Sequence, residues 1–80
     1  MSEEFSNNID QIFSKVDIIS TEMTNQNDRL TAFEDRISDI KISDADQFFL
    51  NKEIMRYRNA ISSIEANNET VSEAATLLKQ

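Results

Sequence analysis

The chain has 80 residues, with 15 acidic and 8 basic side chains for a net charge of -7, and it contains no Gly, Pro, Cys, Trp or His. Because β-hairpins and tight turns rely on Gly and Pro, this composition argues against a sheet protein. Without His or Cys, the chain also lacks the usual zinc ligands and the usual base-assisted nucleophiles. We therefore expect a non-enzymatic, all-α protein with no cofactor and no metal site.

The net negative charge repels the phosphate backbone of nucleic acids, and the sequence has no Lys/Arg cluster to bind it. Both features argue against a nucleic-acid partner. The longest apolar run, residues 48–50, is far shorter than the roughly 18 residues that a membrane span needs, and the polar start does not resemble a secretory signal. A single core in so short a chain rarely supplies more than about 3 to 5 kcal/mol. We expect one small domain without a membrane span that forms an oligomer with copies of itself or with other helical chains.

Residues 1–8 are polar, and we expect them to be disordered. Apolar residues then recur at alternating steps of four and three, which is the heptad pattern of a coiled-coil seam. This pattern predicts a first helix over about residues 9–41, with one polar layer at Gln26. The pattern runs from Phe5 to Ile40, and its apolar seam residues include Ile9, Ile12, Val16, Ile19, Met23, Leu30, Phe33 and Ile37.

The heptad pattern breaks at about residues 41–46, because continuing it would place Asp44 and Gln47 in the core. Ser43 or Asp44 can cap a new helix there, and Asp46 or Gln47 can reach back from its third position. Capping is a simpler role for these acids than calcium binding, which needs a Gly at the turn and a Glu at the twelfth position. The break predicts a connection over about residues 41–46, while a continuous helix with a three-residue stammer is the alternative.

A second heptad run begins at Leu50 and predicts a helix over about residues 47–79, with one polar layer at Asn68. Gln26 and Asn68 either fix the register, as buried polar residues do in coiled coils, or mark places where the seam is solvated. The fold class is therefore all-α, with two long amphipathic helices that form a helical hairpin or coiled coil. The apolar seam residues of the second helix include Ile54, Ile61 and Ile64.

Several apolar side chains lie outside the seam, mostly in the second helix. They either form a second interface, through which the hairpin joins more helices, or are scattered surface residues of the ordinary kind. We favour the interface, because a two-helix hairpin buries only one stripe of each helix. Together with seam residues near the C-terminus, the residues expected at this partner interface are Phe48, Phe49, Met55, Tyr57, Val71, Leu77 and Leu78.

The C-terminal part of the chain resembles small subunits of bacterial type III secretion systems. Residues 70–72 (Thr-Val-Ser) and 76–79 (Thr-Leu-Leu-Lys) resemble the end of inner-rod subunits, and residues 57–60 (Tyr-Arg-Asn-Ala) resemble part of the second helix of some needle subunits. Leu50 and Tyr57 are similar to the spaced Leu and Tyr of both families.

This resemblance implies a structural subunit whose second helix, including Tyr57, Val71, Leu77 and Leu78, packs into a helical assembly that lines a secretion conduit. It also implies a location in the bacterial cytoplasm before export and in the cell-envelope secretion apparatus afterwards. The regular, acidic first seam suits an alternative, a cytoplasmic coiled-coil adaptor or small helical chaperone that binds another helical protein.

Overall fold

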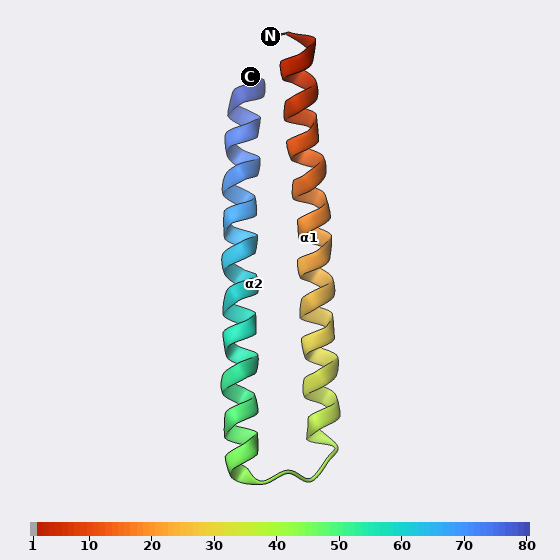
Figure 1. The fold of residues 1–80 in the computed structure, drawn as a ribbon, viewed down its shortest axis with the longest axis vertical. Helices are drawn as coiled ribbons and strands as arrows, with labels where there is room; N and C mark the ends of the chain where they lie inside the picture. The colour runs from red at the N-terminus through yellow and green to blue at the C-terminus, as the bar shows by residue number, and fades with distance from the viewer. Residues whose placement is uncertain (1) are drawn as a thin grey trace.

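The structure, a computed structural model, describes residues 2–80 and consists of two antiparallel helices joined by a short connection (Figure 1). Helix α1 spans Glu3–Ser38 and helix α2 spans Asp44–Lys79. Both ends of the chain lie at one end of a hairpin that measures 61 × 16 × 13 Å between Cα atoms. The all-α hairpin predicted from the heptad pattern is confirmed, and the alternative of one continuous helix is wrong.

Helix α1 begins six residues earlier than predicted. Ser2 caps it, because its Oγ accepts a hydrogen bond of 3.1 Å from the Phe5 N–H, and Glu3 and Glu4 complement the positive end of the helix dipole. Residues 3–8 are therefore helical, which corrects the prediction of disorder over residues 1–8. Of that predicted segment, Met1 lies outside the described residues.

The connection covers residues 39–43, so it is shorter than predicted and begins two residues sooner. Helix α1 ends where the Asp39 N–H donates to the Arg36 carbonyl at 3.1 Å. This bond spans three residues, as in a 3₁₀ turn, instead of the four that an α-helix spans. Ser43 then caps α2, since its Oγ accepts a hydrogen bond of 3.2 Å from the Asp46 N–H. Helix α2 thus begins three residues before the predicted position and ends, as predicted, at residue 79.

The core of the hairpin is one line of side chains along each helix. On α2 the buried side chains are seven residues apart, and on α1 they lie near the two ends of the helix. Each heptad has two seam positions, and in each helix only one of the two faces the other helix directly. No side chain among residues 2–80 is completely buried. The residues that form this buried line are Ile9 and Ile37 on α1 and Ile54, Ile61, Asn68 and Ala75 on α2.

Each helix is 36 residues long, which is enough to cross a bilayer if it were apolar throughout. In the part of the chain that the structure describes, however, neither helix has a stretch apolar enough to span a membrane.

Candidate protein interface

The second seam position of each helix lies on a single side of the hairpin, which we call the open face. Each of these residues lies three positions after a residue in the same heptad phase as the buried line, so it points about 60° away from the facing helix. Because the helices are antiparallel, this rotation carries both rows to the same side. The open face consists of Phe5, Ile12, Ile19, Gln26, Phe33 and Ile40 on α1 and Leu50, Tyr57, Ile64, Val71 and Leu78 on α2.

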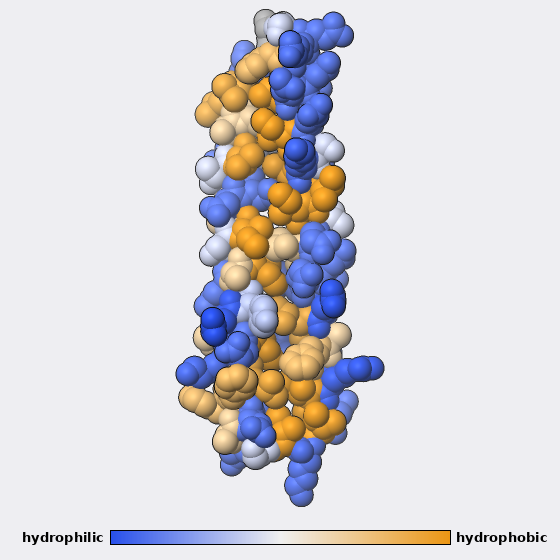
Figure 2. Space-filling model, viewed as in Figure 1, coloured by the Kyte–Doolittle hydropathy of each residue, from blue (hydrophilic) through white to orange (hydrophobic). Residues whose placement is uncertain are grey.

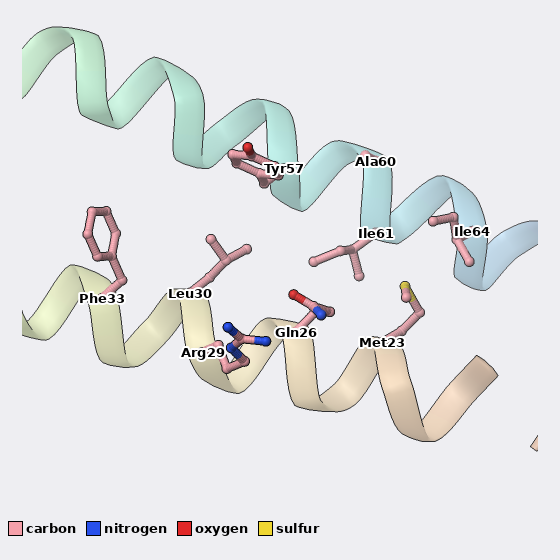
Figure 3. A pocket seen from close by; sticks show the side chains of 9 residues that line it. All are labelled: Met23, Gln26, Arg29, Leu30, Phe33, Tyr57, Ala60, Ile61 and Ile64. Atoms are coloured by element: carbon pink, nitrogen blue, oxygen red, sulfur yellow. The ribbon is translucent and has the colours of Figure 1, made fainter. Parts of the chain in front are cut away.

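A groove of about 570 Å³ runs between the two rows near the middle of the open face (Figure 3). Met23, Gln26 and Leu30 line it from α1, and Tyr57 and Ile64 line it from α2. In Figure 3 Met23, Leu30 and Ile61 extend into the space between the helices, and Tyr57 and Ile64 lie over the ribbon of α2. A second hollow of about 300 Å³ shares Leu30 and Tyr57 with the groove and extends it toward the connection.

Most of the exposed apolar surface of the hairpin belongs to the open face. Of the thirteen large apolar side chains that are exposed among residues 2–80, eight lie in its two rows, so the exposure is not scattered. Tyr57 is 61% exposed, Phe33 is 44% exposed and Ile64 is 40% exposed. Figure 2 shows hydrophobic side chains along both helices on this side of the hairpin; hydrophilic side chains follow most of the α1 edge, and hydrophobic ones reach the α2 edge near both of its ends.

The opposite side of the hairpin, which we call the polar face, carries charged contacts between the helices. Arg58 of α2 donates a hydrogen bond and forms an ion pair with Glu34 of α1. Near the termini, the Lys79 Nζ lies 2.6 Å from the Asp10 carboxylate and 5.7 Å from the centre of the Phe13 ring. These contacts join the two helices at two levels along their length.

Asn68 provides a third polar contact, and it is the one buried polar residue of residues 2–80. Its Nδ2 donates to the Val16 carbonyl at 2.8 Å and to the Ser20 Oγ at 3.0 Å. This geometry supports the interpretation that Asn68 fixes the register. Gln26, the other polar layer, instead lines the open groove, and its Nε2 lies 3.5 Å from the Glu22 carboxylate on its own helix.

The structure divides the predicted seam into three levels of burial. Ile9, Ile37, Ile54 and Ile61 are buried between the helices, Ile12, Val16, Met23 and Leu30 are half-buried, and Ile19, Phe33 and Ile64 are exposed on the open face. The hairpin therefore uses only part of its apolar seam for its own fold.

The predicted interface residues do not form one patch. Tyr57, Val71 and Leu78 lie in the open-face row of α2, and Phe49 lines the hollow that extends the groove. Met55 instead borders a hollow that Glu34 and Arg58 also line, on the polar side of the buried line. The other two lie elsewhere on α2: Phe48 lies 5.4 Å from the Lys52 Nζ, and Leu77 borders a shallow outer hollow with Thr76.

The sequence did not place Phe33, Ile64 and Gln26 on the exposed side of the hairpin, because the heptad pattern assigned them to the seam between the helices. A usable signal was present in α2. Its buried line contains Asn68 and Ala75, whereas the row of the open face is apolar throughout. A row that is more apolar than the core line beside it indicates burial against something else.

The chain matches no family model, no characterised protein and no solved structure. The interface is therefore interpreted from its own chemistry. Two parallel apolar rows with a groove between them are suited to contact another apolar helical surface, as ridges of one helix pack into the grooves of another.

Proposed function

We propose that the protein is a non-enzymatic structural subunit that packs into a helical assembly. The open face is the observation that carries this proposal, because apolar side chains of both helices remain exposed along one side of the hairpin. Burying apolar surface contributes about 25 cal/mol per Å². A partner that covers the open face therefore supplies stability that the two helices alone do not obtain.

Helix α2 contributes most to the surface of the proposed assembly. Its row includes Tyr57, Val71 and Leu78, which are all exposed, and further exposed apolar residues lie outside that row at Phe48 and Leu77. This distribution supports packing through the C-terminal helix. When a partner covers the open face, the exposed apolar residues outside it can still contact further subunits.

The narrower form of the proposal is an inner-rod or needle component of a bacterial type III secretion system, exported from the cytoplasm to the cell-envelope apparatus. It is supported by the resemblance of residues 70–72 and 76–79 to the end of inner-rod subunits. Leu77 and Leu78 of that segment are 71% and 55% exposed, so they are available for packing between subunits. This form predicts open-ended assemblies of variable length.

A second candidate is a coiled-coil adaptor or small helical chaperone, and the shape of the groove favours it. Both helices line one groove of about 570 Å³, which suits the insertion of side chains from a single further helix or hairpin. Such an arrangement closes on itself. It predicts a complex of fixed size in place of an open-ended one.

The test is the size of the complex that contains an epitope-tagged chain in the cells that make it, measured by gel filtration of the lysate. We expect elution well above the 9.2 kDa of one chain. Tyr57→Glu and Val71→Glu place a charge on the open face, and each should return the chain to the monomer position. Ser62→Glu, at an exposed site on the polar side of the buried line, is the matched control and should leave the complex intact.

A chain that elutes as a monomer, or a complex that neither open-face variant changes, contradicts the proposal. The width of the elution peak separates its two forms. A broad distribution of sizes supports the rod or needle subunit, whereas one narrow peak supports the adaptor or chaperone.

A further inference from the structure

We propose that a second copy of this chain covers the open face in solution, and that the two hairpins lie side by side with their connections at the same end. The two copies are related by a two-fold axis along the hairpin, so α1 of each copy packs against α2 of the other in a four-helix bundle. This inference rests on the proposed function, because it names the first partner in the assembly.

The hairpin exposes more surface than a compact chain of its mass, and a second hairpin is large enough to cover its open face. A compact monomer of 9.2 kDa is expected to expose about 4,900 Å², whereas this chain exposes 6355 Å². The two helices side by side span 61 by 16 Å between Cα atoms, a footprint of about 980 Å², and a standard interface buries about 800 Å² of accessible surface on each partner. One further copy therefore provides enough buried area, and its own open face is covered at the same time.

Two arrangements bring two open faces together, and they differ in which helices meet. With the connections at the same end, each α1 meets the α2 of the other copy. With the connections at opposite ends, α1 meets α1 and α2 meets α2. Neighbouring helices are antiparallel in both cases, so helix direction does not decide between them.

Charge along the outer edges of the open face favours the first arrangement. Each edge residue precedes a position of the buried line by one, which places it on the outer side of the open face. The edge of α1 is basic overall although the chain is acidic, whereas the edge of α2 carries two acids, Asp46 and Glu53, and Arg56 pairs with Glu53 within α2 at 3.1 Å. The edge of α1 contains Asn8, Lys15, Glu22, Arg29 and Arg36, and the edge of α2 contains Asp46, Glu53, Ala60, Asn67 and Ala74.

The level of Glu53 matches the basic part of the α1 edge. Glu53 and Phe33 line the same hollow, so they lie at one level along the hairpin. Arg29 and Arg36 are each within about one helical turn of Phe33. With the connections at the same end, Glu53 of one copy lies near Arg29 and Arg36 of the other, whereas the opposite arrangement places the two basic edges against each other.

Gln26 gives an independent reason for the same arrangement. It is the polar residue in the α1 row of the open face, and its side chain points from α1 into the groove (Figure 3). A two-fold axis along the hairpin places the two copies of Gln26 at the same level on either side of the axis. A carboxamide both donates and accepts hydrogen bonds, so the two side chains satisfy each other when the face is covered.

The first test measures self-association and orientation on the purified chain. Sedimentation equilibrium from micromolar to submillimolar concentration should give a dimer. Lys41→Cys places a single thiol in the exposed connection of a chain that otherwise has none, and a nitroxide attached there reports the distance between the two connections. Pulsed dipolar spectroscopy should then give a distance below half of the 61 Å length of the hairpin.

The outcomes separate this inference from the proposed function. A dimer whose labels lie about one hairpin length apart overturns the arrangement, and a chain that stays monomeric at every concentration overturns the pairing of copies. In either case, a large complex in cell lysate that depends on Tyr57 and Val71 still supports the proposed function with another partner. A monomer in both measurements overturns both.

A second test uses Gln26, which is half-buried and can change without removing a residue of the buried line. Gln26→Glu places two carboxylates across the axis and should raise the dimer dissociation constant at least about tenfold. Gln26→Leu removes the polar layer and should lower the dissociation constant. Thr24→Glu adds the same charge at an exposed site on the polar side and should leave it unchanged, and an equal effect of Thr24→Glu and Gln26→Glu contradicts the inference.

Discussion

The two faces of the hairpin are built from the same two helices and flank the same buried line, yet their chemistry is opposite. Across the polar face, Arg58 contacts Glu34 and Lys79 contacts Asp10. Across the open face, apolar rows face each other over a groove, and the hydrogen bond of Gln26 stays within its own helix. One face thus joins the helices through polar contacts, and the other leaves its apolar surface exposed.

This difference separates register from stability. Exposed ion pairs contribute only about 0.2 to 1 kcal/mol each, so the polar face mainly determines how the helices are aligned. Apolar surface contributes in proportion to the area removed from water, and the open face gains that contribution only when a partner covers it. If the open face binds a partner as proposed, the free energy of unfolding should rise with the concentration of that partner.

The largest effect is expected when an acidic residue replaces an isoleucine of the buried line. Ile61 belongs to the buried line and is only 7% exposed. Ile61→Asp leaves a carboxylate between the helices without a partner, and we expect it to lower the free energy of unfolding by about 3 kcal/mol or more. Urea denaturation followed by circular dichroism at low concentration measures this loss.

Ile64→Asp is the matched variant, since Ile64 lies one turn away on the open face. At a concentration where the chain is monomeric, it should change the free energy of unfolding by less than about 1 kcal/mol. At high concentration it should prevent association. Equal loss of helicity in the two variants would show that the open face belongs to the core of the hairpin, contrary to the structure.

Much of the fold was predictable because the heptad pattern is long and regular. The alternation of four and three steps predicted both helices, and its break located the connection near Ser43. The boundaries were less accurate because they depend on single hydrogen bonds. Ser2 caps α1 in a mostly polar segment, so the helix begins at Glu3, two residues before the first apolar residue of the pattern, Phe5.

The candidate interface was predicted only in part, for a geometric reason. Heptad spacing identifies two seam positions per repeat but does not state which of them the second helix covers. In a bundle of more helices both are buried, whereas in this hairpin Ile61 is buried and Ile64 is exposed. The separation of Phe48 and Met55 from the groove likewise depends on how the helices are rotated about their axes, which the sequence pattern leaves undetermined.

A smaller effect is expected when the two polar seam residues are compared. Asn68→Ala removes hydrogen bonds to Val16 and Ser20 from a buried site, and we expect it to lower the free energy of unfolding by about 1 to 2 kcal/mol. Gln26→Ala removes a half-exposed side chain that bonds within its own helix, so the cost to the monomer should be below about 0.5 kcal/mol. Urea denaturation of both variants at low concentration provides the measurement, and a larger loss for Gln26→Ala would reverse the roles assigned to the two residues.

The smallest effect is expected on the polar face itself. The Arg58 and Glu34 side chains are 37% and 43% exposed, so solvent screens their ion pair. A double-mutant cycle with Arg58→Met and Glu34→Gln should give a coupling free energy of about 0.2 to 1 kcal/mol that decreases as salt is added. Neither variant should change association through the open face, because both residues lie on the other side of the buried line. A coupling well above this range, or a loss of association in either single variant, would show that the polar face contributes to the assembly and that the two faces are less separate than their chemistry indicates.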